Sequence, residues 1–156
     1  MKSSLRMMMA TVAMAAVAFC ADNTLGTWKM DAAKSKAPSG QSPIKSATTI
    51  REAAGDGVKM SVKGEREDGT KIDVSYTAKY DGKPVTMSGS GLPYDTVSLT
   101  MKDANTVKDV RSKKGGKYKG TGTFAVSKDG KTATLSTKGT GADGKPFESM
   151  TAFDKH

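Results

Sequence analysis

The residue types that most often perform catalysis are scarce in this chain. His156 is the only histidine and the last residue, and Cys20 is the only cysteine. A serine–histidine–aspartate triad, a cysteine–histidine pair and a metal site built on histidine or cysteine are therefore excluded. From the sequence we expect no catalytic residues, no enzyme activity, no bound metal and no cofactor.

The aspartates lie at turn signals and not in pairs suited to acid–base chemistry. Asp56, Asp68, Asp81, Asp129 and Asp143 each precede a glycine. At such a position the aspartate side chain caps the backbone of a tight turn. The sequence also lacks an Asp-x-Asp-Gly calcium loop, so we expect these carboxylates to have structural roles.

The chain of 156 residues is basic, with a formal net charge of +9. Its lysines are scattered, apart from one dense basic run. This run is either a solvated hairpin tip or a contact patch for an anionic envelope surface such as lipid head groups. Aromatic residues hardly interleave with it, so we expect no specific binding of nucleic acid. The patch consists of Arg111, Lys113, Lys114, Lys117 and Lys119.

Evenly spaced turn signals organise the chain from residue 56 onward. Asp-Gly between alternating runs predicts hairpins with type I′ turns. Polar and apolar residues alternate between the turns, which is typical of half-buried strands. Val107 and Val110 break this alternation and indicate a bulge or a weak strand. We expect a polar loop over 31–46 and strands at 25–30, 47–53, 58–65, 71–80, 84–88, 95–101, 106–112, 117–127, 132–138 and 146–153.

Sequential strands with one apolar face must cover that face. Closure into a barrel does so and removes both sheet edges. The sequence therefore predicts an all-β fold, an antiparallel up-and-down β-barrel of about eight to ten strands. A two-sheet sandwich and an outer-membrane barrel are the alternatives.

The inward face of such a barrel is the candidate binding site. Ile50 and many other residues fall on this face by alternation. Its methionines suit an adaptable apolar pocket, and its tyrosines offer hydroxyls that orient a ligand. The alternative is that the same side chains form a dry core. The predicted lumen residues are Met60, Ile72, Val74, Tyr76, Met87, Leu99, Met101, Tyr118 and Phe124.

Gly26-Thr27-Trp28 opens the first predicted strand, ahead of the hairpin ladder. This combination resembles the calycin superfamily, which includes lipocalins and fatty-acid-binding proteins. The resemblance implies that Gly26 and Trp28 mark the closed end of the barrel, with the Trp28 ring against a basic side chain of the last strand. Lys155 is the only basic residue near that position. The Arg-x-Tyr carboxylate motif of the fatty-acid-binding branch is missing.

The N-terminus has the pattern of an export signal. Lys2 and Arg6 precede an apolar run over 7–19, so we expect a signal peptide at 1–21 and a single barrel domain at 22–156. The mature chain has no apolar segment that predicts a transmembrane span. We expect a periplasmic or secreted monomer. A lipoprotein acylated at Cys20 and an uncleaved N-terminal anchor are the alternatives.

The sequence and the resemblance together imply a small exported bacterial protein. We expect a non-catalytic lipocalin-like protein that binds a small apolar or amphipathic molecule in its lumen. The alternative is an envelope interaction module that binds an anionic partner through the basic patch.

Overall fold

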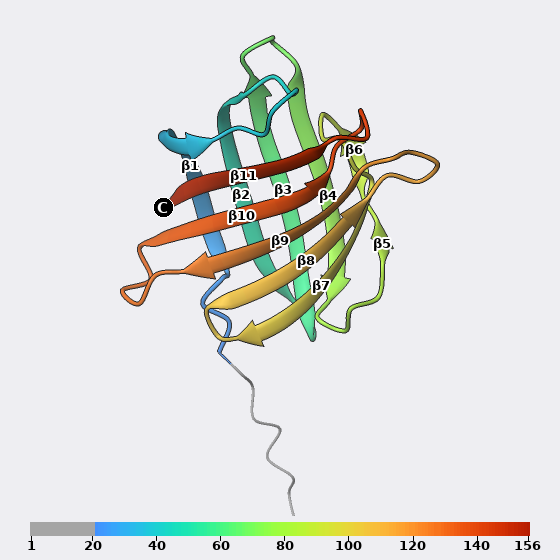
Figure 1. The fold of residues 1–156 in the computed structure, drawn as a ribbon. Helices are drawn as coiled ribbons and strands as arrows, with labels where there is room; N and C mark the ends of the chain where they lie inside the picture. Colours follow the sequence, from blue (N-terminus) through green and yellow to red (C-terminus); the bar gives the residue numbers. More distant parts are fainter. Residues whose placement is uncertain (1–20) are drawn as a thin grey trace, which may run out of the picture.

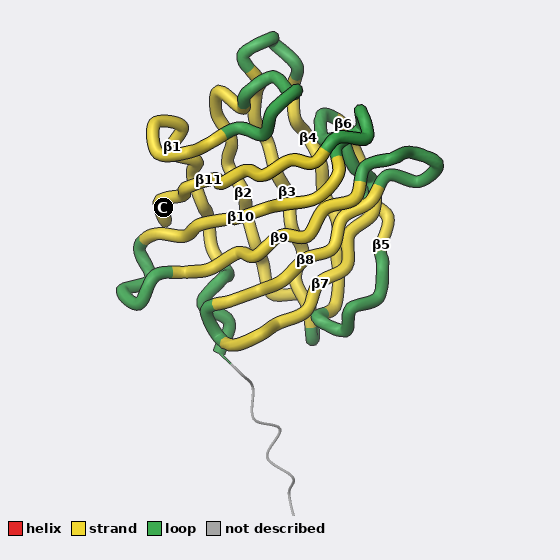
Figure 2. The backbone as a smooth tube through the Cα atoms, viewed as in Figure 1, coloured by secondary structure: helices red, strands yellow, loops and turns green. Residues whose placement is uncertain are grey.

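The computed structural model describes residues 21–156, and every regular element in this range is a β-strand (Figures 1 and 2). Nine of the eleven strands are 7 to 11 residues long, and tight turns join most of them, as the hairpin ladder predicts. Their bounds are β1 Gly26–Lys36, β2 Ile44–Ala54, β3 Gly57–Arg66, β4 Lys71–Lys79, β5 Val85–Thr86, β6 Ser88–Ser90, β7 Thr96–Asp103, β8 Thr106–Ser112, β9 Lys119–Val126, β10 Thr132–Thr140 and β11 Pro146–Lys155.

The strands curl into a nearly closed antiparallel barrel (Figure 1). Their hydrogen-bonded order is β5-β7-β8-β9-β10-β11-β1-β2-β3-β4-β6, so the last strand pairs with the first. The two ends of this order belong to one short segment, 85–90. Its first part pairs with β7 and its last part with β4, so this segment joins the two edges. The predicted up-and-down barrel is confirmed.

The hairpin turns differ in type from the prediction. Positive φ angles in residues 21–156 occur at glycines alone, whereas a type I′ turn needs them at both central residues. In the turns at 66–69, 127–130 and 141–144, the fourth residue is a glycine with positive φ whose amide donates to the first carbonyl. These are therefore type I turns followed by a left-handed glycine.

The aspartates of these turns cap the backbone as predicted. The Oδ1 atoms of Asp68, Asp129 and Asp143 each accept a hydrogen bond from the amide two residues on, at 2.9–3.0 Å. The β2–β3 hairpin is different, because its turn lies at Gly55-Asp56, one residue earlier than predicted. There Gly55 takes the positive φ of +59°.

The first strand continues further than predicted. We expected a polar loop from residue 31, but β1 extends to Lys36 and bends on the way. Its pairing with β11 shifts between Asp31 and Lys36. Ser35 fills the gap, because its hydroxyl donates to the Asp31 carbonyl at 2.7 Å and accepts from the Ala152 amide at 3.0 Å. The Ser35 hydroxyl thus takes the place of main-chain hydrogen bonds between β1 and β11. The alternation of polar and apolar residues does not reveal such a substitution.

Strand β2 has the opposite phase to the one predicted. Ile50 is exposed, whereas Thr49 and Arg51 are buried. The pairs Arg51–Met60 and Ala53–Val58 on adjacent strands place Arg51 on the same face as inward side chains. The pattern placed Ile50 inside because it is apolar, whereas the neighbouring interior position is taken by the charged residue Arg51.

Strand β8 has the predicted bounds but lacks the bulge that the sequence suggested. It pairs with β7 and β9 in regular register across Val107 and Val110, and no bulge lies between them. Val110 points outward and is 56% exposed. Its inward neighbour is Asp109, which is buried, so polar residues occupy interior positions of this strand.

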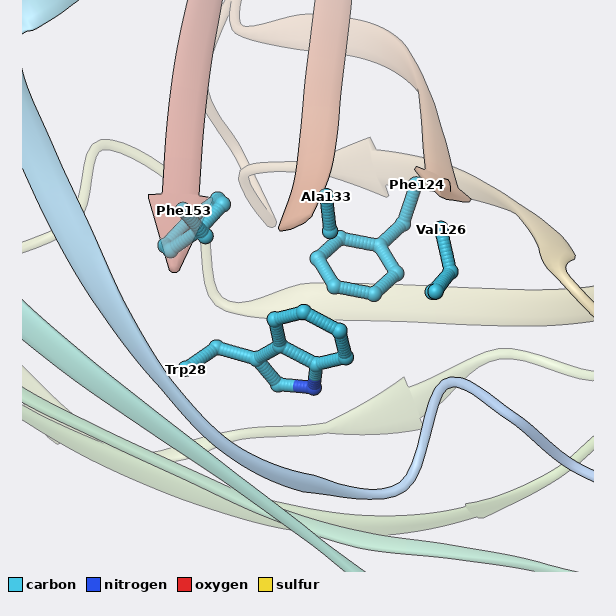
Figure 3. Packing of buried hydrophobic residues seen from close by; sticks show 5 residues of the cluster. All are labelled: Trp28, Phe124, Val126, Ala133 and Phe153. Carbon is cyan, nitrogen blue, oxygen red and sulfur yellow. The ribbon is translucent and has the colours of Figure 1, made fainter. Parts of the chain in front are cut away.

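Two apolar clusters fill part of the barrel. One surrounds Trp28 and includes Phe124, Val126, Ala133 and Phe153 (Figure 3). The other lies on β3, β4, β7 and β8 and comprises Val58, Ala78, Val97, Leu99 and Val107. The interior lined by β1, β2, β10 and β11 beyond Trp28 is less filled, and it contains the candidate site.

Candidate functional site

Trp28 plugs one end of the barrel. Its side chain is fully buried, and its Nε1 donates to the Thr24 carbonyl at 2.9 Å. The Phe124 ring meets it edge to face, with centroids 5.5 Å apart (Figure 3). On another side, the Lys155 ammonium of the last strand lies 5.2 Å from the Trp28 ring centre. A first-strand tryptophan covered by a last-strand cation is the arrangement that the resemblance implied.

A cavity of about 620 Å³ occupies the other end. Its wall is mainly apolar, with a few hydroxyls and a small number of charged groups. Strands β1, β2, β10 and β11 supply most of it, and the loops at 37–43 and 92–94 cover its mouth. This size and lining are typical of pockets for small molecules. The lining residues include Met30, Thr49, Tyr94, Arg111, Tyr118, Leu135, Thr137, Phe147 and Phe153.

Of the nine predicted lumen residues, Tyr118 alone lines this cavity. The other eight face the interior elsewhere. Phe124 packs on Trp28, and Met60 lies beside Arg51. Ile72 and Val74 are buried on β4. Tyr76, Met87, Leu99 and Met101 belong to or pack against the second apolar cluster. These residues fill the barrel beside the cavity, and a role in ligand binding stays a prediction for them.

Sequence reasoning missed Thr49, Tyr94 and Arg111 as cavity residues. Thr49 was missed because the phase of β2 was wrong. Tyr94 lies in a loop rich in glycine and proline. The two-residue alternation that marks inward side chains in strands does not apply there. Arg111 was assigned to a surface because charged residues are seldom buried unless they are paired. The one available signal was Asp109, which stands two residues from Arg111 and so on the same face of the strand.

Arg111 is not part of a surface patch, contrary to the prediction. Its Nε and Nη2 donate to Oδ1 and Oδ2 of Asp109 at 2.7 Å and 2.8 Å. Both side chains are about nine-tenths buried, with exposed fractions of 11% and 10%. The guanidinium also lies 5.0 Å from the ring centre of Tyr94. The pair is therefore bidentate, interior and charge-neutral as a unit.

Three aromatic rings form a column beside this ion pair. Tyr94 stacks on Tyr118 with centroids 5.4 Å apart, and Tyr118 stacks on Phe147 at 5.5 Å. All three line the cavity. Burial raises the pKa of Tyr118 to about 12 and also raises the pKa of Tyr94. Both phenols therefore stay protonated at neutral pH and are available as neutral donors.

A second interior arginine lies outside the cavity wall. Arg51 is 4% exposed, and its guanidinium lies over Phe124, 5.1 Å from the ring centre. It donates to Tyr80 Oη at 3.4 Å, and Tyr80 in turn donates to the Asp22 carboxylate at 2.6 Å. Within residues 21–156, Arg51 Nε is the one buried side-chain nitrogen or oxygen without a hydrogen-bond partner. The tyrosine thus links this cation to an acid near the start of the barrel.

Arg66 holds the mouth of the cavity. Its Nη1 donates to the Ser42 carbonyl at 2.7 Å. Its Nε and Nη2 donate to the Gly91 carbonyl at 3.4 Å and 3.2 Å. These carbonyls belong to the loops that follow β1 and β6. One side chain therefore ties together the two segments that cover the opening.

The other four residues of the predicted patch are exposed near one hairpin. They are Lys113, Lys114, Lys117 and Lys119. Lys113 already pairs with Asp95 at 3.0 Å. Because Arg111 points inward, the basic surface cluster is smaller than predicted.

Metal ligands, membrane-spanning helices and the N-terminal segment add little to the description of the site. No group of three or more metal-ligating side chains gathers anywhere in residues 21–156. The same stretch contains no helix with the length and apolarity needed to cross a bilayer. Cys20 and almost all of the predicted signal segment 1–21 lie outside the described residues.

Comparisons with known proteins gave structural matches alone. No protein-family model and no curated sequence matches the chain. Zebrafish ileal bile acid-binding protein in complex with cholic acid is 14% identical. It aligns with 86% of this chain and 100% of its own, at a TM-score of 0.49. A redesigned β-barrel, mFAP1, bound to DFHBI is 13% identical and aligns with 86% of this chain and 95% of its own, at a TM-score of 0.45.

Proposed function

We propose that this protein is a non-catalytic carrier or scavenger of a small apolar or amphipathic molecule, which it holds inside the barrel. The observation that carries the proposal is the cavity of about 620 Å³ between the Trp28 plug and the loops at the mouth. A core that served stability alone would be packed to a density that leaves few voids larger than a water molecule.

The chemistry of the wall supports binding without reaction. Met30, Leu135 and Phe153 supply apolar surface, and Thr49 and Thr137 supply hydroxyls. Such a wall favours an occupant with a large apolar body and few polar atoms. The cavity-lining residues include no histidine or cysteine, and the one deep cation is held by Asp109.

The proposal includes export, which rests on the N-terminal sequence pattern. Intact mass measurement of the protein from its native envelope fraction tests this part, since cleavage near residue 21 or acylation at Cys20 gives a distinct mass. The same spectrum under native conditions would reveal a bound molecule by an added mass that denaturation removes.

The binding part is tested with the neutral dye Nile red. Leu135→Trp places a bulky indole ring in the cavity, whereas Ser136→Trp places the same ring on the exposed outer face one residue later. We expect the wild-type protein and Ser136→Trp to enhance the dye fluorescence with saturation, and Leu135→Trp to bind at least about tenfold more weakly. Equal binding by both variants would contradict occupation of the cavity.

A further inference from the structure

The cavity contains one deeply placed cation, and that cation is already neutralised. Arg111 lines the wall, whereas Asp109 lies behind it, next to Gly122 of β9. The carboxylate takes two of the guanidinium donors, Nε and Nη2. The third nitrogen, Nη1, stays outside the pair. An occupant of the cavity therefore meets a hydrogen-bond donor without a net positive charge behind it.

The polar groups next to Arg111 are also hydrogen-bonding groups without a net charge. Tyr94 and Tyr118 lie beside Arg111 and are neutral phenols at neutral pH. Thr49 and Thr137 add hydroxyls to the cavity wall. These groups stabilise a hydroxyl or carbonyl oxygen at about the strength of ordinary hydrogen bonds, but they do not replace the hydration that a buried carboxylate loses.

The other cations in or near the barrel do not supply a free positive charge to a ligand in the cavity. Arg51 is absent from the cavity wall and is linked through Tyr80 to the Asp22 carboxylate. Arg66 lies at the mouth, and its donors are directed to two main-chain carbonyls. Lys36 and Lys45 are exposed at the rim, where water screens their charge.

We propose that the cavity selects an uncharged amphiphile, with an apolar body and a hydroxyl or carbonyl head beside Arg111, and that Asp109 sets this preference. The inference rests on the proposed function and names the ligand class of the same site. Asp109 acts as a specificity-determining residue without touching the ligand. It holds the charge of Arg111 so that a neutral head group is accepted and an anionic one is excluded.

The test compares dodecanol with dodecanoate, which share the apolar chain and differ in the head group. Each displaces Nile red from the wild-type protein at pH 8. We expect dodecanol to bind at least about tenfold more tightly than dodecanoate. Asp109→Asn frees the charge of Arg111, and we expect this variant to gain at least about tenfold in affinity for dodecanoate with little change for dodecanol.

Two further measurements keep the test decisive. Replacing Asp109 with Leu and Arg111 with Met together removes both charges, so the preference for dodecanol should remain. If Asp109→Asn does not fold, the wild-type protein is titrated with dodecanoic acid at falling pH. Its affinity should then rise toward that of dodecanol as the carboxyl group of the ligand becomes neutral.

Distinct outcomes overturn the two proposals. Tighter binding of dodecanoate than dodecanol by the wild-type protein overturns the inference and leaves the binding function intact. Capture of Nile red with no displacement by either compound also overturns the inference. A folded wild-type protein that captures none of the three molecules overturns the proposed function itself.

Discussion

Gly122 lies against the carboxylate of Asp109 on the neighbouring strand. A Cβ atom built on Gly122 would fall 2.6 Å from both carboxylate oxygens, which is far inside van der Waals contact. The register that pairs Asp109 with Gly122 therefore gives the interior ion pair the space that it needs.

We expect Gly122→Ala to destabilise the protein because the added methyl group displaces Asp109 from Arg111. The cost should be about 1–3 kcal/mol, the range for overpacking in a core. Urea unfolding measures it, and Thr121→Ala on the exposed face is the control. If Asp109→Ala is introduced first, Gly122→Ala should cost much less. Equal costs in both backgrounds would argue against the steric relationship.

Trp28 should be the largest single contributor to stability at the closed end. Trp28→Ala removes a fully buried ring and should cost about 3–5 kcal/mol. Trp28→Phe keeps an aromatic ring but leaves the Thr24 carbonyl without its donor, for a cost of about 1–3 kcal/mol. Thermal and denaturant unfolding followed by circular dichroism check both values. A loss of less than 1 kcal/mol for the alanine variant would mean that the end is closed by other groups.

Arg66 should control the rate at which an occupant leaves the cavity. Arg66→Met keeps the length of the side chain but removes the donors to the Ser42 and Gly91 carbonyls. We expect the two covering loops to separate more readily and Nile red to dissociate about threefold to tenfold faster. Stopped-flow dilution measures this rate. Lys71→Met, at an exposed position on β4, is the control, and equal rates for both variants would contradict the role of Arg66.

Asp95 should make stability depend on pH in the acidic range. Hydrogen bonds from the Lys114 amide and the Lys113 ammonium hold the pKa of its carboxyl below the usual value. A carboxyl with a depressed pKa in the folded state contributes stability above its unfolded pKa of about 3.9. This contribution is lost as pH falls through the folded value.

Asp95→Asn should therefore lower the unfolding temperature at pH 7 and reduce the further loss between pH 5 and pH 2. Melting curves across this range check the difference from wild type. Asp56→Asn, on an exposed turn, is the matched control. If the variant melts like the wild-type protein at every pH, Asp95 does not stabilise this hairpin.

The fold was predictable because its determinants are local and repeated. Alternation such as Ile72-x-Val74 sets strand faces, and Asp-Gly pairs set turn positions. The contact of Lys155 with Trp28 was implied by the family resemblance. The type of turn was not predictable in the same way, because the glycine after a type I turn and the glycine of a type I′ turn occur in similar sequences.

The site was less predictable because it depends on exceptions to alternation. Arg51 and the Asp109–Arg111 pair occupy interior positions where apolar residues are expected, and Ile50 and Val110 take outward positions. Burial of a charge becomes favourable only when its partner is in place, and that condition is a property of the folded barrel. A strand pattern read for hydrophobicity alone therefore assigns such residues to the wrong face.

The segment 85–90 has a consequence for the dynamics of the whole barrel. Two residue pairs join it to β7 and three join it to β4, whereas the other neighbouring strands share longer ladders. Local opening needs the least free energy where the fewest hydrogen bonds must break. Amide hydrogens in this segment should exchange first, and each opening uncovers the edges of β4 and β7 at once. Two unpaired edges on one molecule are competent to pair with a second chain, so closure by this short segment also removes the two edges through which a second chain could add.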